Sequence, residues 1–200
     1  MPSPDPPRIG VLGGTFDPPH FGHLAAGLEV RHRLRLSVVL FMVANDPWQK
    51  SALHPGTPAP VRLEMVRAAV RDLEGLEASA LEVDRGGESY TADTLQELRV
   101  LHPAAELLLV VGSDAAQGLE TWKRPEELRE LATTVVGERA GRCGGRPAAG
   151  WPAVVVDVPG LDISSCDIRS RFADGRPVEA LVPGAVASLV RSRGLYGCGR

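Results

Sequence analysis

The sequence predicts an α/β fold with a doubly wound parallel sheet and helices on both of its sides. Short apolar segments alternate with segments of helical periodicity along the whole chain. Several of these short segments are apolar at consecutive positions, which is typical of strands covered on both faces. The 200 residues, of which 44% are hydrophobic and 24% charged, suit a globular unit of ordinary composition.

The expected elements follow from this pattern in chain order. We expect a disordered proline-rich tail at 1–7, then a single domain over 8–196 that ends in a helical part at about 164–196. Strands are expected where apolar runs end in turn residues, and helices where apolar residues recur every three or four positions. The strands expected are 8–12, 37–44, 76–83, 106–111, 133–136 and 153–158. The helices expected are 22–36, 60–73, 91–101, 126–132, 167–172 and 183–193, and the glycine-rich stretch 140–152 is expected to be a loop.

Composition excludes several classes of protein. Lys plus Arg is 22 and Asp plus Glu is 25, and a net charge of −3 argues against a nucleic-acid partner. The chain has an odd number of cysteines without C-x-x-C spacing: Cys143, Cys166 and Cys198. This argues against a disulfide scaffold and against a structural zinc site. No apolar stretch approaches the ~20 residues that span a bilayer, and the N-terminus lacks a signal-peptide profile. We therefore expect a reduced, cytoplasmic protein with no membrane partner.

The loop after the first expected strand has the features of a phosphate site. In parallel sheets, ligands bind beyond the carboxyl ends of the strands. Gly13 and Gly14 allow the backbone to approach a ligand closely. His20 and His23 share a face at a helix start, where free N–H groups suit phosphate. The alternative is a glycine turn with two core or solvent histidines, and a metal site is disfavoured because no third ligand is near.

Two further loops carry candidate phosphate contacts. Ser164 and Ser165 precede a helix, where serine is a favoured cap, and Arg169 lies one turn further on the same face. This combination forms either a second phosphate clamp or a simple cap beside a surface arginine. Lys50 follows the second strand and, with Lys123, is one of only two lysines among 22 basic residues. The chain uses arginine for nearly all of its basic residues. Lys50 is therefore either a lysine kept for a phosphate contact or one that remains without a functional reason.

Together these motifs resemble a known enzyme family. The stretch GGTFDPPHFGH resembles the signature of the HxGH nucleotidyltransferase superfamily. The other motifs narrow the resemblance to bacterial nicotinate-mononucleotide adenylyltransferases, over residues 8–196. This resemblance implies a Rossmann-like nucleotidyltransferase fold and transfer of the adenylyl group of ATP to nicotinate mononucleotide, which yields nicotinate adenine dinucleotide and pyrophosphate in NAD biosynthesis. The narrowing motifs are 89–95, 112–114, Trp122, 163–169 and 181–196.

The resemblance also implies roles for particular residues. Mg²⁺ is expected as a cofactor that enters with ATP, without a metal site built by the protein. Trp122 is expected to stack on the cationic pyridinium ring, although a lone Trp is often only a packing anchor. The implied catalytic residues are His20, His23, Lys50 and Arg169. The implied ATP-binding residues are Gly13, Gly14, Thr15, Phe16, His20, His23, Gly112, Asp114, Ile163, Ser164, Ser165 and Arg169. The implied substrate-binding residues are Thr15, Asn45, Lys50, Ser89, Tyr90, Thr91, Trp122 and Arg139.

The choice of mononucleotide follows from the helix that Ser89, Tyr90 and Thr91 open. Backbone N–H groups at a helix start have no partner within the helix, and the helix dipole favours an anion there. A carboxylate accepts from such donors, whereas a carboxamide brings a donor against a donor. We therefore expect nicotinate mononucleotide to be preferred over nicotinamide mononucleotide.

The chain departs from the family pattern at three positions, and two other functions are weighed. Cys166 stands for the usual Thr, Gln49 for a His beside the lysine, and Ala140 for a Pro. A sister adenylyltransferase, such as one acting on phosphopantetheine, would lack the 89–95 and tryptophan segments. A non-catalytic nucleotide-sensing module would have lost one of the catalytic histidines or the arginine. The sequence leaves the oligomeric state open, a homo-oligomer included.

Overall fold

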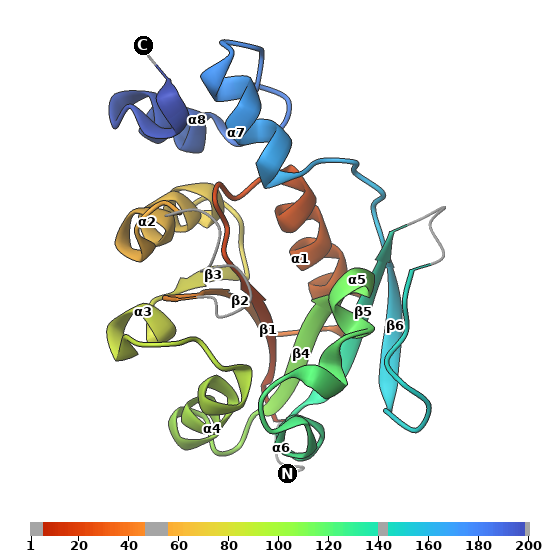
Figure 1. The fold of residues 1–200 in the computed structure, drawn as a ribbon. Coiled ribbons are helices and arrows are strands. Elements are labelled where there is room, and N and C mark those ends of the chain that lie inside the picture. The colour runs from red at the N-terminus through yellow and green to blue at the C-terminus, as the bar shows by residue number, and fades with distance from the viewer. Residues whose placement is uncertain (1–5, 47–55, 140–143, 199–200) are drawn as a thin grey trace.

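The computed structural model describes residues 6–46, 56–139 and 144–198, and its centre is a six-stranded sheet (Figure 1). All strand pairs are parallel, in the order β3-β2-β1-β4-β5-β6. This is the doubly wound order, and it confirms the predicted fold class. The strands are β1 (Arg8–Gly14), β2 (Val38–Val43), β3 (Leu76–Ser79), β4 (Glu106–Gly112), β5 (Thr133–Arg139) and β6 (Ala153–Val158).

The sheet order reverses between its two central strands. β1 pairs with β2 on one side and with β4 on the other, so the connections from these strands run in opposite directions. Gly10 in β1 leaves room for the side chain of Leu36, because a Cβ at this position would lie 2.8 Å from Cδ1 of Leu36. The reversal leaves a crevice above the carboxyl ends of β1 and β4, where ligands of such sheets bind.

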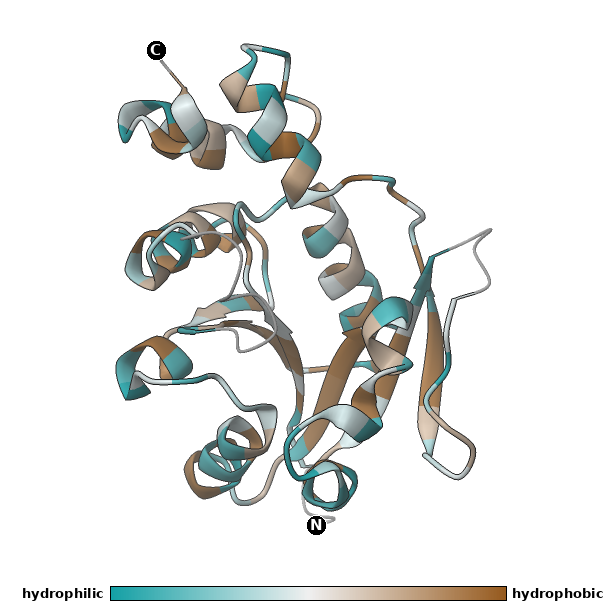
Figure 2. Cartoon of the chain, in the orientation of Figure 1, coloured by the Kyte–Doolittle hydropathy of each residue, from teal (hydrophilic) through white to brown (hydrophobic). Residues whose placement is uncertain are grey.

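Helices cover both faces of the sheet and enclose two apolar cores. One core packs the sheet against α1, α2, α7 and α8, and the other packs it against α4 and α6. Figure 2 shows apolar strands in the middle and helices of mixed character around them. The α-helices are α1 (Phe21–Leu34), α2 (Ala59–Val70), α3 (Leu81–Arg85), α4 (Thr91–Leu101), α5 (Ser113–Ala116), α6 (Pro125–Leu131), α7 (Ser165–Ala173) and α8 (Gly184–Ser192). Two 3₁₀ turns, η1 (Leu119–Thr121) and η2 (Leu195–Gly197), complete the elements.

The C-terminal helices lie at the carboxyl end of the sheet, above α1 and α2 (Figure 1). Ile168 and Phe172 of α7 and Val186 of α8 are buried in the same core as α1 and α2. The backbone N–H of Phe21 donates to the carbonyl of Leu181 over 3.0 Å, which joins the start of α1 to this part. The chain end is therefore fixed directly above the loop that follows β1.

Several element boundaries differ from the sequence prediction. The strand expected over 76–83 ends at Ser79, and Leu81–Arg85 form the helix α3 instead. The short apolar run there fitted either period, and short runs of that kind cannot be assigned by periodicity alone. β5 continues to Arg139 rather than ending at residue 136, and α5 and η1 were not predicted. Residues 1–5 of the expected tail lie outside the described residues, while the carbonyl of Pro7 accepts a backbone hydrogen bond from Glu106.

Candidate active site

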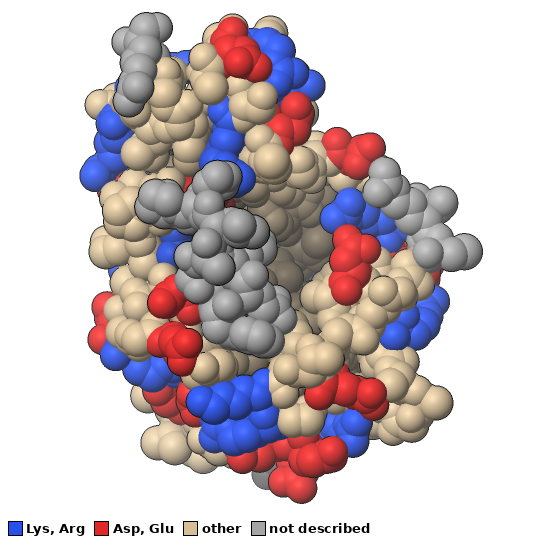
Figure 3. Space-filling view, viewed as in Figure 1, with Lys and Arg blue, Asp and Glu red and all other residues tan. Residues whose placement is uncertain are grey.

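A cavity of about 1500 Å³ opens at the carboxyl ends of β1, β4 and β5. Figure 3 shows this end of the molecule hollowed, with basic side chains on the rim. Its walls come from segments far apart in the sequence, from Leu12 in β1 to Tyr196 in η2. The sequence-predicted residues that line it are Gly13, Gly14, Thr15, Phe16, His20, His23, Asn45, Gly112, Asp114, Arg139, Ile163, Ser164, Ser165 and Arg169.

The two glycines after β1 serve different purposes. A Cβ at Gly13 would meet nothing within 4 Å, so this backbone lies open to the cavity. A Cβ at Gly14 would lie 2.8 Å from Cζ of Phe16, so this glycine makes room for an aromatic ring. Phe16 is only 3% exposed, and its ring meets His23 edge to face at 5.0 Å between centroids. Gly13 thus permits ligand approach, while Gly14 and Phe16 support His23 from below.

The two histidines at the start of α1 form a stacked pair. Their ring centroids are 3.6 Å apart with an angle of 22° between the planes. Nδ1 of His23 accepts the backbone N–H of His20 over 3.2 Å. The proton of a neutral His23 ring is therefore on Nε2, which makes that nitrogen a donor.

The environment of His20 keeps its ring uncharged. The residue is 7% exposed. Burial, and then the positive charge of Arg139, lower the pKa of His20 to about 4. The ring is neutral at pH 7, so it can act as a hydrogen-bond donor but not as a cation. A neutral ring also avoids charge repulsion within the stacked pair.

The start of α7 is docked onto the loop that follows β1. Oγ of Ser165 donates to the carbonyl of Pro18 over 2.9 Å, and Nη1 of Arg169 donates to the carbonyl of Asp17 over 2.8 Å. Oγ of Ser164 accepts the N–H of Asp167 over 3.1 Å as the helix cap. The Ser165 hydroxyl thus donates within the protein, whereas the Ser164 hydroxyl only accepts and can still donate its own proton. What α7 presents to the cavity is its helix start, where the first backbone N–H groups have no partner within the helix.

A buried arginine that the sequence analysis missed joins the segments that follow β1 and β2 to the residues just before α2. Arg62 of α2 is 3% exposed and donates to three backbone carbonyls: Thr57 at 2.8 Å, Thr15 at 2.8 Å and Asn45 at 3.0 Å. Burial lowers the pKa of Arg62, and the negative charge of Asp17 opposes that shift. The signal in the sequence was a charged residue at a core position, three residues from both Ala59 and Met65.

A second missed group ties the chain end to the same loop. Asp17 is 7% exposed, and its carboxylate accepts the hydroxyl of Tyr196 at 2.6 Å and the N–H of Thr57 at 3.2 Å. Burial, followed by the charge of Asp17 and the hydrogen bond to it, raises the pKa of Tyr196 above its ordinary range. Tyr196 therefore stays protonated and donates to the carboxylate. No local pattern in the sequence marks this pairing across 179 positions.

The predicted contacts at the start of α4 lie next to the cavity rather than in its lining. Ser89, Tyr90, Thr91 and Trp122 are not among the lining residues. Asn45 connects the two places, because its backbone N–H donates to Oγ of Ser89 over 2.8 Å and its side chain to the carbonyl of residue 87 over 2.9 Å. Lys50, and with it Gln49, lie outside the described residues.

The described residues offer neither a metal site nor a membrane span. Within the described ranges, no group of three or more His, Cys, Asp or Glu side chains could hold a metal ion. No helix in that part of the chain is long and apolar enough to cross a membrane. The positive side chains on the cavity wall are Arg62, Arg139 and Arg169, of which Arg62 is occupied by backbone carbonyls.

This arrangement defines a nucleotide-binding α/β protein. A glycine turn and the starts of two helices, α1 and α7, meet at one cavity above the point where the strand order reverses. Helix starts bind phosphate through free N–H groups, and cavities at this position bind nucleotides.

Comparison with known proteins gives the family. The cytidylyltransferase-like family model matches residues 11–171. A relative from Thermus thermophilus, described as a probable nicotinate-nucleotide adenylyltransferase, is 44% identical over 94% of this chain and 99% of its own. One from Saccharopolyspora erythraea with the same description is 40% identical over 94% of this chain and 89% of its own. The chain therefore belongs to the cytidylyltransferase-like family.

A solved structure agrees with this fold. The nicotinic acid mononucleotide adenylyltransferase of Plasmodium falciparum, complexed with NaAD, superposes with a TM-score of 0.78. It covers 96% of this chain and 98% of its own at 17% sequence identity, so the likeness concerns the fold.

Proposed function

We infer that this chain is a nicotinate-nucleotide adenylyltransferase. The 5′-phosphate of nicotinate mononucleotide attacks the α-phosphorus of ATP, and nicotinate adenine dinucleotide and pyrophosphate are released. The relatives that are 40% and 44% identical over nearly the whole chain support the activity. The observation in the structure that carries it is the stacked pair His20–His23 at the start of α1, in one cavity with the start of α7.

The chemistry asks for positioning and charge stabilisation rather than a general base. The attacking phosphate is already an anion, so no proton has to be removed from it. Negative charge builds on the oxygens around the α-phosphorus, and preorganised donors stabilise it there. In this proposal Nε2 of His23 and the neutral ring of His20 are those donors. A buried donor at His20 that carries no charge avoids the cost of burying a cation.

ATP is proposed to lie along the β1 loop, the end of β4 and the start of α7. Gly13–Phe16, Gly112 and Asp114 would line the nucleoside side, while Ile163–Ser165 and Arg169 would hold the β- and γ-phosphates, with Lys50 as a further contact. Because the Ser165 hydroxyl donates to Pro18, the α7 contacts would come from backbone N–H groups, the Ser164 hydroxyl and the guanidinium of Arg169. Mg²⁺ would enter with ATP and neutralise phosphate charge, since this ion is usually held by substrate phosphates and water.

Nicotinate mononucleotide is proposed to lie between Thr15, Asn45 and Arg139 on the cavity wall and the start of α4 beside it. Ser89, Tyr90 and Thr91 would place backbone donors at the ring carboxylate, and Trp122 would stack on the cationic ring. The free thiols of Cys166 and Cys198 agree with a reduced, cytoplasmic setting.

A substrate panel tests this proposal. Pyrophosphate release is measured with ATP and Mg²⁺ against nicotinate mononucleotide, nicotinamide mononucleotide and phosphopantetheine. One donor–donor mismatch costs ~1–3 kcal/mol, so kcat/KM should favour the nicotinate substrate by roughly tenfold to a hundredfold over the amide. A ratio near one, or one that favours the amide, would contradict the substrate assignment. Release with phosphopantetheine alone would favour the sister enzyme, and no release at all would favour a sensing module.

A further inference from the structure

The segment between β4 and α6 has little regular structure of its own. It consists of α5 with four residues, the 3₁₀ turn η1 with three, and an extended backbone at Trp122 with φ −73° and ψ 156°. Helical turns this short do not hold themselves in water, because nucleation costs more than a few hydrogen bonds return. The position of Trp122 therefore depends on its own packing against the apolar core beside α4 and α6, and on the contacts that its neighbours make with the rest of the protein.

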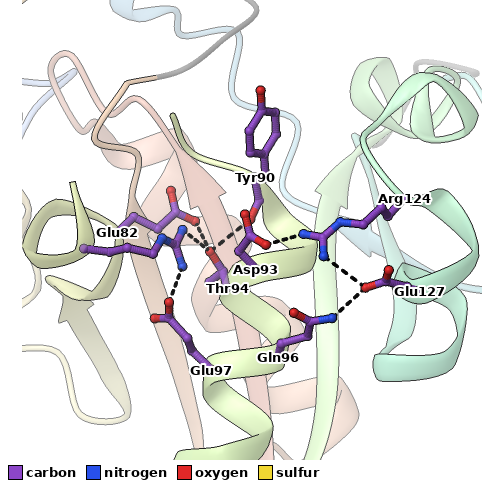
Figure 4. Close-up of polar contacts among 9 residues, drawn as sticks. Glu82, Tyr90, Asp93, Thr94, Gln96, Glu97, Arg124 and Glu127 are labelled. Carbon is purple, nitrogen blue, oxygen red and sulfur yellow. Dashed lines mark hydrogen bonds and ion pairs between the residues drawn. The ribbon is translucent and has the colours of Figure 1, made fainter. Parts of the chain in front are cut away.

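Arg124, two residues further on, makes polar contacts with both α4 and α6. Its backbone lies in the left-handed region, at φ 56° and ψ 58°, where glycine is the usual residue. Its guanidinium pairs with Asp93 in the first turn of α4 and with Oε2 of Glu127 in α6 over 3.3 Å. Nε2 of Gln96 donates to the same Glu127 oxygen over 2.7 Å (Figure 4). We call these four residues, Asp93, Gln96, Arg124 and Glu127, the clasp.

A second contact joins the same two segments. Nζ of Lys123 lies 3.8 Å from the ring centroid of Tyr90, the residue that caps α4. Both residues that follow Trp122 are therefore attached to the start of α4, one by an ion pair and one by a cation–π contact. An arginine whose backbone is held in the left-handed region costs roughly 1 kcal/mol of folding free energy relative to a relaxed backbone. The side-chain contacts that only arginine can make at this position offset that cost.

We propose that the clasp positions Trp122 against the first turn of α4 and thereby sets the geometry of the nicotinate-ring part of the site. The inference rests on the proposed function, because it assigns the ring to these two elements. Asp93 and Arg124 act here as positioning residues, through the tryptophan ring and the α4 backbone donors. The proposed ATP contacts at the β1 loop, Gly112, Asp114 and the start of α7 make no contact with the four clasp residues, so the clasp should affect the binding of one substrate only.

The sharpest test replaces Arg124 with glycine. Glycine adopts φ 56° without strain, so Arg124→Gly removes the clasp while it relaxes the backbone. We expect KM for nicotinate mononucleotide to rise about tenfold, since small misplacements of binding groups are costly. KM for ATP should stay within about twofold, and Tm should change little. Asp93→Asn should shift the same KM in the same direction without touching residue 124.

A matched control exists elsewhere in the chain. Arg35, exposed at the end of α1, also has a left-handed backbone, with φ 51°. Arg35→Gly makes the same change of residue in the same backbone conformation, far from the clasp, and should leave both KM values unchanged.

Each outcome bears on the clasp or on the proposed function separately. If Arg124→Gly leaves KM for nicotinate mononucleotide unchanged, or raises both KM values equally, the clasp does not position the ring. If that variant fails to fold, Asp93→Asn decides by the same comparison of KM values. The double variant should be no worse than the worse single one, because both remove the same ion pair. A wild-type protein that is inactive on nicotinate mononucleotide would refute the proposed function, whereas an active one with unaffected variants refutes only the clasp.

Discussion

The polar contacts that hold the β1–α1 loop come from buried donors, whereas those that hold the Trp122 segment are side-chain pairs that water can reach. At the loop, Arg62 is 3% exposed and each of its three hydrogen bonds ends on a backbone carbonyl. At the clasp, the side chains of Arg124 and Asp93 are 32% and 37% exposed. The loop carries the two histidines, and the Trp122 segment carries the candidate ring contact.

The difference in exposure between the two sets of contacts agrees with the function proposed for each region. A transition-state donor has to be fixed to a fraction of an ångström, and buried hydrogen bonds to backbone fix it at low dielectric. A ring-stacking contact tolerates more movement, and half-exposed ion pairs contribute less than ~1 kcal/mol each. We therefore expect changes at the loop to affect folding and turnover, and changes at the clasp to affect one KM.

The substitution Arg62→Met should have the largest effect, a decrease in the free energy of unfolding. The change leaves three backbone carbonyls without their donor and removes a buried positive charge that interacts with the carboxylate of Asp17. Each unsatisfied buried group costs ~1–3 kcal/mol, so we expect the free energy of unfolding to fall by about 4 kcal/mol. Urea denaturation followed by circular dichroism measures this.

The control for that change lies on the same helix. Arg67 is exposed on α2, and Arg67→Met should alter the free energy of unfolding by less than about 0.5 kcal/mol. If the two variants proved equally stable, Arg62 would not hold the loops. Should Arg62→Met not accumulate as folded protein, Tyr196→Phe removes one hydrogen bond to Asp17 and should cost about 1–2 kcal/mol.

His20→Asn examines the loop through catalysis and through pH. Loss of one preorganised donor should lower kcat by about 10²–10³. The pKa of His20 is about 4 in the folded protein and 6.5 without burial. Between these values the unfolded chain takes up a proton that the folded chain does not. The stability associated with His20 is thus fully present above pH 6.5 and decreases as the pH falls towards 4, by roughly 3 kcal/mol in all.

Unfolding free energies measured from pH 7 to pH 4 test the second part. Wild type should lose stability over this window more steeply than His20→Asn, which cannot take up the proton. His102 is exposed, and His102→Asn should follow the wild-type curve. Parallel curves for wild type and His20→Asn would show that the ring is not held neutral.

The sequence predicted the position of the β1–α1 loop and its histidines, but it did not predict the contacts that hold this loop in place. Consecutive apolar strands, glycines at a strand end and histidines at a helix start are local patterns, and they led to the parallel sheet and to His20 and His23 in one cavity. Arg62 and the Asp17–Tyr196 pair were missed because their partners are backbone carbonyls and a residue 179 positions away. No local periodicity encodes such contacts.

The start of α4 shows the reverse case. Ser89–Thr91 and Trp122 were singled out from motifs, but the ion pairs of Arg124 with Asp93 in α4 and with Glu127 in α6 were not. The run over 76–83 was also misread, since its second half forms α3, where Glu82 is buried and accepts from Thr94 of α4 over 2.6 Å. The sequence does not reveal with which oppositely charged residue a given charged side chain will pair in the fold.

The smallest expected effect is a change with ionic strength, and it separates the two regions directly. Salt screens half-exposed charge pairs, whereas buried hydrogen bonds to backbone are screened little. Both substrates are anions, so KM for nicotinate mononucleotide will rise with salt in any variant, and the ratio of Arg124→Gly to wild type is the informative quantity. That ratio should shrink from about tenfold towards about threefold as ionic strength rises from about 0.05 M to about 0.5 M, because salt weakens the clasp in wild type and the variant has none to lose. The kcat ratio of His20→Asn to wild type, measured in the same buffers, should stay constant. A ratio for Arg124→Gly that does not change with salt would mean that the clasp acts through packing rather than charge, and that the two regions are held by the same kind of contact after all.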